Sequence, residues 1–115
     1  MDTSSKLNQR KTDILTQLAT LGPMRKGTIS EQYVQVTLKD GSSRQRGPYT
    51  LYTFKEHAKT VSRRLSDPSR IALYRQQIAT FRRFQDLTRE LAKISQSLAD
   101  LEEAGEAGGK KNSRR

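Results

Sequence analysis

Apolar residues recur at helical spacing at both ends of the chain, and the pattern changes between them. Near the N-terminus, leucine and isoleucine fall on one face of a helix, so we predict a helix over residues 4–21. The residues on this face are Leu7, Ile14, Leu18 and Leu21, with Leu15 widening the stripe. Gly22-Pro23 ends the helix, because glycine accepts a left-handed C-cap and proline cannot continue a helix.

The middle of the chain follows the two-residue period of β-strands. Residues 33–38 alternate between apolar and polar, and residues 49–54 are rich in aromatic and β-branched side chains, so we predict a strand over each. We predict a third strand over residues 60–65. Asp40-Gly41 marks a hairpin turn, because both residues tolerate positive φ. A second tight turn falls at residues 56–59. Short turns between consecutive strands predict a three-stranded antiparallel meander.

A long helix is predicted to follow, opened by Ser66-Asp67-Pro68 as cap and first turn. Its apolar positions form a heptad seam with one skip between Phe81 and Phe84. They are Ile71, Tyr74, Ile78, Phe81, Phe84, Leu87, Leu91, Ile94, Leu98 and Leu101. At 1.5 Å per residue this helix is about 50 Å long and the first about 27 Å, so the first covers only about half of it. We therefore expect a homodimer to form through the uncovered part of the seam, as in a coiled coil.

These elements predict an α+β fold with a short N-terminal helix, a three-stranded antiparallel β-meander and a long C-terminal helix that pairs antiparallel with the first. We predict that residues 1–103 form a single α-βββ-α domain. Residues 104–115 have no apolar period and contain several glycines and basic residues, so we predict a disordered basic tail there.

Composition excludes several classes of chemistry. The chain has no cysteine and one histidine, His57, so it has no disulfide framework, thiolate zinc site or multi-histidine metal site. The phosphate-loop signature and paired catalytic carboxylates are also missing. We expect no cofactor and no enzymatic activity. No run of about 18 apolar residues and no N-terminal signal sequence are present, so we expect a cytoplasmic protein without membrane contact.

Charge gives the main functional indication. The net charge is +10, and residues 24–93 hold fifteen basic and six acidic residues, with ten arginines among the fifteen. Such a surface attracts polyanions through counterion release, and arginine matches phosphate and guanine better than lysine. We therefore predict nucleic-acid binding, with double-stranded DNA as the favoured ligand. The predicted contact residues are Lys39, Arg44, Arg46, Lys59, Arg63 and Arg64.

Other interpretations stay open at this point. The basic residues could form a solvated face that only maintains solubility, and the long helix could make the protein an interaction or oligomerisation module. Tyr49, Tyr52 and Phe54 could stack on exposed bases, although packing of one strand face on the helices is the commoner role of such residues. Phe81 and Phe84 belong to the predicted core.

Two stretches resemble a known family. The runs Gly47–Glu56 and Lys59–Leu65 are similar to a family of small uncharacterised bacterial and archaeal proteins whose genes lie near transposases and other mobile-element genes. The resemblance covers residues 21–101 and implies an accessory role in a mobile element, with a mobile-element protein as a partner. Many relatives have a cysteine cluster before the Gly-Pro-Tyr run and glycine at the position of Ala58. This chain has neither, which excludes a metal-stabilised hairpin.

Overall fold

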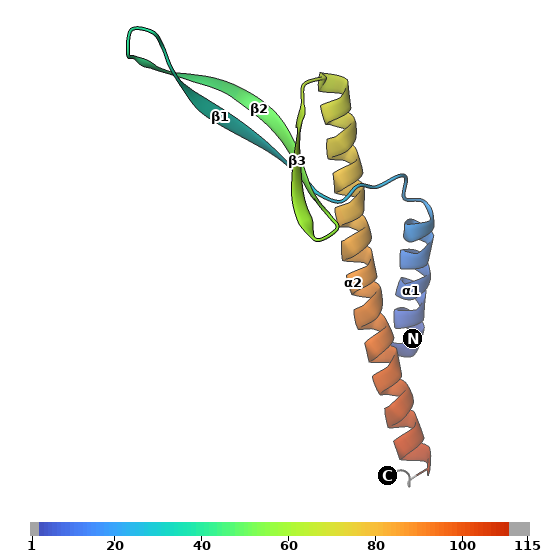
Figure 1. The fold of residues 1–115 in the computed structure, drawn as a ribbon. Helices are drawn as coiled ribbons and strands as arrows, with labels where there is room; N and C mark the ends of the chain where they lie inside the picture. The colour runs from blue at the N-terminus through green and yellow to red at the C-terminus, as the bar shows by residue number, and fades with distance from the viewer. Residues whose placement is uncertain (1–2, 111–115) are drawn as a thin grey trace. The chain divides into compact units, whose positions relative to one another are not determined.

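The computed structural model describes residues 3–110, and the side chains of residues 3–105. Two helices flank three consecutive strands, so the predicted α+β order is confirmed (Figure 1). The elements are α1 (Thr3–Ala19), β1 (Thr28–Thr37), β2 (Ser43–Glu56), β3 (Lys59–Leu65) and α2 (Pro68–Lys110). The strands form one antiparallel sheet in the order β1-β2-β3, as the meander predicts.

The chain forms two compact units, and α2 contributes to both. The helical unit contains α1 and the part of α2 from Arg82 onward, and the sheet unit contains residues 22–81. Each unit has its own cluster of buried side chains. The single domain over residues 1–103 stays a prediction. The skip predicted between Phe81 and Phe84 lies where α2 passes from one unit to the other.

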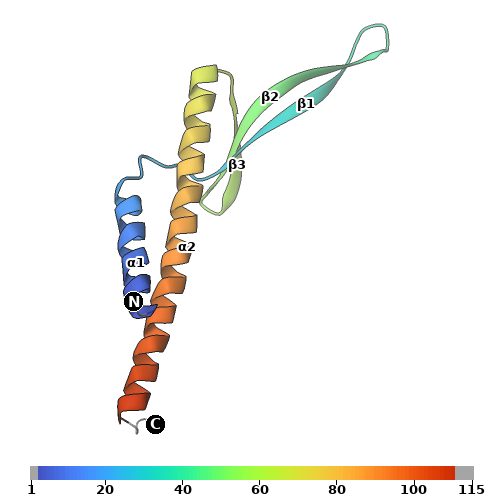
Figure 2. The ribbon, with the colours of Figure 1, turned by 180° about the vertical axis from the view of Figure 1, so that it is seen from behind.

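The helical unit is an antiparallel pair. Arg10 on α1 contacts Glu90 on α2, and Gln17 contacts Arg83, so residue numbers rise along one helix as they fall along the other (Figures 1 and 2). Its buried residues are Ile14, Leu87 and Ile94, with Leu7, Leu18, Leu21, Leu91 and Leu98 packed around them. The predicted stripe is therefore confirmed except at Leu15, which is 48% exposed. It lies beside Ile14 in sequence, about 100° away around the helix, and so leaves the contact face.

The sheet unit buries one face of the sheet against the first part of α2. Tyr52 and Leu65 pack with Tyr74 and Ile78. Ile29, Phe54 and Ile71 are partly buried against this cluster. Because side chains alternate between faces along a strand, we call this side of the sheet the helix-facing side and the other side the open face.

Two strands are longer than the pattern predicts. β1 starts at Thr28 rather than residue 33, and β2 starts at Ser43 rather than residue 49. The added β2 residues pair with β1 mainly through polar positions, such as Gln45 with Gln35 and Ser43 with Thr37. Backbone pairing in a ribbon does not require burial of the side chains, so these exposed positions show no hydrophobic pattern.

Sequence features account for where α2 begins and how far it extends. Asp67 caps its start, since its Oδ1 accepts hydrogen bonds from Ser69 N at 3.0 Å and Ser69 Oγ at 2.9 Å. Pro68 is the first helical residue, as predicted. The helix then continues to Lys110, so the predicted boundary of the tail at Ala104 lies inside it. Alanine and glutamate in this stretch are strong helix formers, which offsets the glycines. Residues 111–115 of the predicted tail lie outside the described residues.

Candidate nucleic-acid interface

The sheet unit concentrates unpaired positive charge. It contains eleven basic and four acidic residues. Asp40 and Asp67 accept hydrogen bonds from Ser42 and Ser69 in their own turns, which lowers the pKa of both carboxyls. Glu31 faces Arg75 at 3.8 Å. Within residues 3–105, none of the six predicted contact residues has a carboxylate at ion-pair distance.

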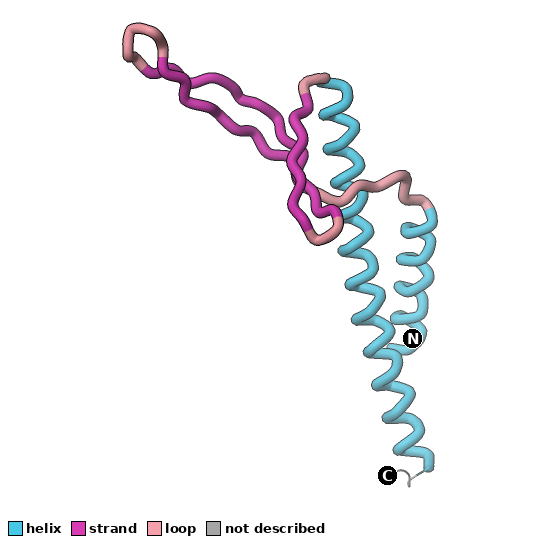
Figure 3. Tube along the Cα trace, viewed as in Figure 1, coloured by secondary structure: helices cyan, strands magenta, loops and turns pink. Residues whose placement is uncertain are grey.

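Three of the six lie on the hairpin formed by β1 and β2. Residues 39–48 are all exposed, and the hairpin extends away from the first part of α2 (Figures 1 and 3). Arg44 pairs with Val36, Arg46 pairs with Val34, and Lys39 lies in the turn. We call residues 33–46 the hairpin arm. It presents basic side chains beside exposed apolar ones on a narrow two-stranded ribbon.

A glycine shapes the base of the hairpin arm. Gly47 has φ of 126°, and the strand register shifts between Gln32 and Val34 directly opposite. A Cβ at Gly47 would lie 2.8 Å from the carbonyl oxygen of Gln32, so only glycine fits without a shift of the backbone. The peptide bond to Pro48 is cis. The extra β2 residues form a bulge, which bends a ribbon and increases its twist.

The adjacent arginines of β3 point to opposite sides of the sheet. Arg64 lies on the open face, with its Cζ 3.8 Å from the centroid of the Tyr49 ring. Arg63 lies on the helix-facing side, with its Cζ 5.2 Å from the centroid of Phe54. Lys59 occupies a position on the same side as Arg63, opposite Glu56 in the second turn. The six predicted residues therefore do not form one patch: Lys59 and Arg63 are separated from Arg64 by the sheet.

The aromatic residues of the sheet are mostly engaged in packing. Tyr52 is 3% exposed, stacks on Phe54 at 4.9 Å between ring centroids, and meets Tyr74 edge-on at 5.0 Å. Tyr49 is partly covered by the guanidinium of Arg64. The aromatic ring exposed on the hairpin arm is that of Tyr33, at 56%. Sequence reasoning missed Tyr33 because its position alternates with the apolar face and does not belong to it.

Sequence reasoning also missed a cluster of arginines around Tyr74. Arg25, from the segment before β1, lies over the Tyr74 ring with its Cζ 3.9 Å from the centroid. Its Nε donates to Gln77 Oε1 at 3.0 Å, and its backbone N donates to Gln77 O at 3.0 Å. Arg70, one turn before Tyr74 on α2, donates from its Nη2 to the phenol oxygen at 3.3 Å. Arg25 and Tyr74 lie far apart in the sequence, so no local pattern indicates this contact.

The electrostatic effect of this cluster falls on the phenol. The hydrogen bond from Arg70 is the largest cause that lowers the pKa of Tyr74 below its ordinary value, and burial opposes it. The positive charges of Arg25, Arg70 and Arg63 lower the pKa further. Arg63 on β3, which lies against Phe54, has the smallest of these effects on the pKa of Tyr74.

Other candidate features differ in chemistry from a polyanion surface. His57 lies exposed in the second turn with φ of 51°. In the described part of the chain, no group of three or more His, Cys, Asp or Glu residues is placed to hold a metal ion. No helix among the described residues is long and apolar enough to cross a membrane.

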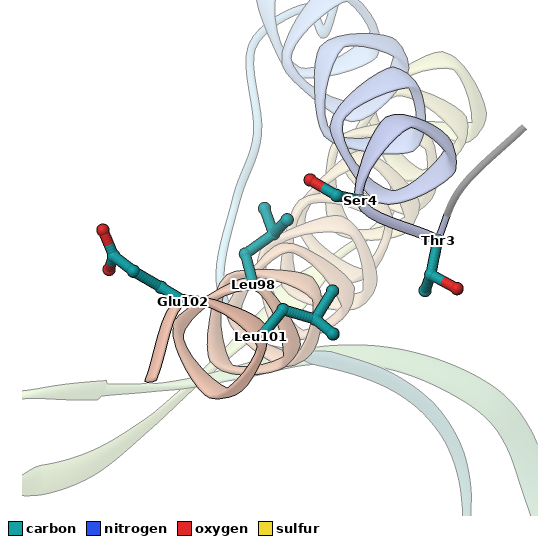
Figure 4. Close-up of a pocket in the computed structure, with 5 residues that line it drawn as sticks. All are labelled: Thr3, Ser4, Leu98, Leu101 and Glu102. Carbon is teal, nitrogen blue, oxygen red and sulfur yellow. The ribbon is translucent and has the colours of Figure 1, made fainter. Parts of the chain in front are cut away.

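An open hollow in the helical unit is partly apolar, and the described residues that line it include no basic group. It is lined by Thr3, Ser4, Leu98, Leu101 and Glu102. Figure 4 shows Leu98 and Leu101 of α2 next to the first turn of α1, from which Thr3 and Ser4 come. Such a lining is suited to an apolar side chain of a partner and unsuited to phosphate.

Comparison with known proteins adds no family assignment: no protein-family model, curated protein or solved structure matches this chain.

Proposed function

We propose that this protein binds nucleic acid without catalysing a reaction, and that its ligand is double-stranded DNA contacted by the hairpin arm. The resemblance of residues 21–101 to proteins encoded near transposases extends this proposal to an accessory role in a mobile genetic element. The observation that carries the proposal is the exposed hairpin arm, with Lys39, Arg44 and Arg46 free of carboxylate partners among the described residues.

The dimensions and chemistry of the hairpin arm support duplex binding. The major groove is about 12 Å wide and admits a two-stranded β-ribbon. Arginine and lysine at the turn and along β2 can contact phosphates on the groove walls. Val34 and Tyr33, 46% and 56% exposed, offer apolar contacts of the kind made with thymine methyl groups and sugars.

The experiment that tests this proposal compares two triple variants in duplex binding at several salt concentrations. The hairpin set replaces Lys39, Arg44 and Arg46 with alanine. The helix set replaces Arg82, Arg83 and Arg89, and so removes the same charge from α2. Each lost phosphate contact lowers the log–log salt slope by about 0.9, so the hairpin set should lower it by up to about 2.7. Loss of binding in the helix set alone would contradict the assignment to the arm.

The hollow lined by Leu98 and Leu101 favours a second candidate function, a protein-interaction or oligomerisation module that uses the end of α2. Leu101 belongs to the predicted seam and is 39% exposed. A second copy of the chain or a mobile-element protein could cover it. A protein with this function alone would show no salt-dependent binding to random duplex DNA.

A further inference from the structure

The arginine cluster of the sheet unit is a second candidate site, separate from the hairpin arm. Its guanidinium groups come from three parts of the chain: Arg25 before β1, Arg63 on β3 and Arg70 on α2. Each lies over an aromatic ring, with Cζ-to-centroid distances of 3.9 Å, 5.2 Å and 5.6 Å to Tyr74, Phe54 and Tyr74 respectively. These contacts limit the positions that the guanidinium groups adopt.

The three charges are not neutralised by the protein. None of the three arginines has a carboxylate at ion-pair distance within the described residues. Asp67 interacts electrostatically with Arg70, but its Oδ1 already accepts two hydrogen bonds from Ser69. Glu31 faces Arg75 instead. Asp67 therefore offsets only part of the positive charge of the cluster. Like charges close together repel one another, so an anion bound among the three arginines would relieve this repulsion.

The hydrogen-bonding capacity of the cluster is also incomplete. The Tyr74 oxygen accepts a hydrogen bond from Arg70, which leaves the phenol proton available to donate. Arg25 uses its Nε on Gln77, so its terminal nitrogens keep donors to spare. No acceptor for these groups lies among the residues whose side chains are described. The unused groups are all donors, which is the complement of an oxyanion.

We propose that Arg25, Arg63 and Arg70, together with the Tyr74 hydroxyl, bind a phosphate-type oxyanion. Guanidinium groups bind phosphate oxygens through paired N–H donors. Arg25 is held in place by the Tyr74 ring and Gln77, so it loses little conformational freedom when the anion binds. The phosphate could belong to a nucleic-acid backbone, in which case this inference rests on the proposed function, or it could be free phosphate.

Adjacent arginines provide a matched pair of variants. Arg63→Gln removes one guanidinium from the cluster, and Arg64→Gln removes the same charge from the open face of the same strand. Titration of the full chain with inorganic phosphate at constant ionic strength, followed by calorimetry, should show about tenfold weaker binding for Arg63→Gln, the usual loss for a charge-assisted hydrogen bond. Arg64→Gln should bind phosphate like the unmodified chain. Arg70→Gln should repeat the effect of Arg63→Gln, and near-ultraviolet circular dichroism of the tyrosines checks that each variant is folded.

Titration of the same variants with duplex DNA identifies the source of the phosphate. If Arg63→Gln binds duplex more weakly than Arg64→Gln, the site binds the nucleic-acid backbone. If Arg63→Gln weakens the binding of inorganic phosphate but not of duplex, the site binds free phosphate. Phosphate binding by a chain that does not bind duplex would leave this site standing and overturn the proposed function. Two outcomes would overturn the inference without affecting the proposal for the hairpin arm. In the first, Arg63→Gln and Arg64→Gln have equal effects on the binding of both ligands. In the second, the unmodified chain does not bind phosphate and the two variants bind duplex equally.

Discussion

Ile14 on α1 and Leu87 on α2 belong to one buried cluster, and they are 0% and 1% exposed. The two helices therefore pack closely against each other near the middle of α1. Leu87→Ala should lower the free energy of unfolding by about 2–5 kcal/mol, because a large buried side chain leaves a cavity. Leu15→Ala, beside Ile14 but 48% exposed, is the control and should change stability by less than about 0.5 kcal/mol. Urea unfolding of both variants measures the difference, and equal effects would contradict the assigned contact face.

Acid should weaken the helical unit through Glu90. The hydrogen bond from Arg10, at 2.6 Å between Arg10 Nε and Glu90 Oε2, is the main cause that lowers the pKa of Glu90 below its ordinary 4.5. A carboxyl with a lowered pKa in the folded state adds stability above the unfolded-state pKa and loses it as pH falls through the folded-state pKa. Melting temperature should therefore fall less for Glu90→Gln than for the unmodified chain between about pH 6 and about pH 3.

Salt provides the control for this ion pair. Both side chains are about 40% exposed, at 42% and 41%, so their interaction is screened by solvent and ions. Added sodium chloride should reduce the difference between Glu90→Gln and the unmodified chain above pH 4.5. A pH dependence identical in the two proteins would show that other carboxyls account for acid sensitivity.

The sequence predicted the elements of this fold because each carries a local signal. The helical period identifies both helices, the proline after Asp67 marks the start of α2, and Asp40-Gly41 marks the first turn. Residues 43–48, at the exposed start of β2, carry no such signal. Pairs such as Gln35 with Gln45 are held by backbone hydrogen bonds, which any side chain permits, so the length of the hairpin was underestimated.

The candidate site was less predictable than the fold. Counting charges located the basic part of the chain, but the direction of each side chain depends on strand register. Arg63 and Arg64 were predicted to act together, and the pleat of β3 places them on opposite sides. Arg25 acquires its position from Gln77, 52 residues later in the chain, and no local pattern shows that contact.

The second turn should be stabilised by glycine. His57 and Ala58 both have positive φ, of 51° and 67°, in the two-residue turn between β2 and β3. A residue with a Cβ is strained by about 1 kcal/mol in this conformation, and glycine is not. Ala58→Gly should therefore raise the free energy of unfolding, by up to about 1 kcal/mol, as measured by urea unfolding.

A second alanine serves as the control for this turn. Ala79 is exposed in the interior of α2, where glycine costs about 1 kcal/mol through lost helix propensity. Ala79→Gly should therefore destabilise the chain while Ala58→Gly stabilises it. Destabilisation by both substitutions would mean that position 58 does not adopt the left-handed conformation.

Self-association through α2 is a separate prediction that concerns the hollow beside α1. Leu101 is exposed there, next to Leu98, and a second copy could cover both residues. Leu101→Lys would place a charge in this contact and should shift sedimentation at micromolar concentration toward the mass of one chain. Leu73→Lys, 48% exposed on the sheet-unit part of α2, should leave the association unchanged. If the unmodified chain sediments as a monomer, the predicted homodimer is wrong.

The shape of the hairpin arm can be changed without changing its charge. Gly47→Ala introduces a Cβ at φ of 126° and 2.8 Å from the carbonyl oxygen of Gln32, so the bulge at the base of the arm must shift. In the complex that we propose, Arg44 and Arg46 would then lose their alignment with the groove. We expect duplex affinity to fall by up to about tenfold, which corresponds to about 1.4 kcal/mol. Gly22→Ala, where a Cβ meets nothing within 4 Å, is the control and should bind normally. Gly47→Ala could instead bind duplex normally while the triple alanine variant of the hairpin set does not. The arm would then attract DNA by charge alone, and the proposed fit of the arm to the major groove would be wrong.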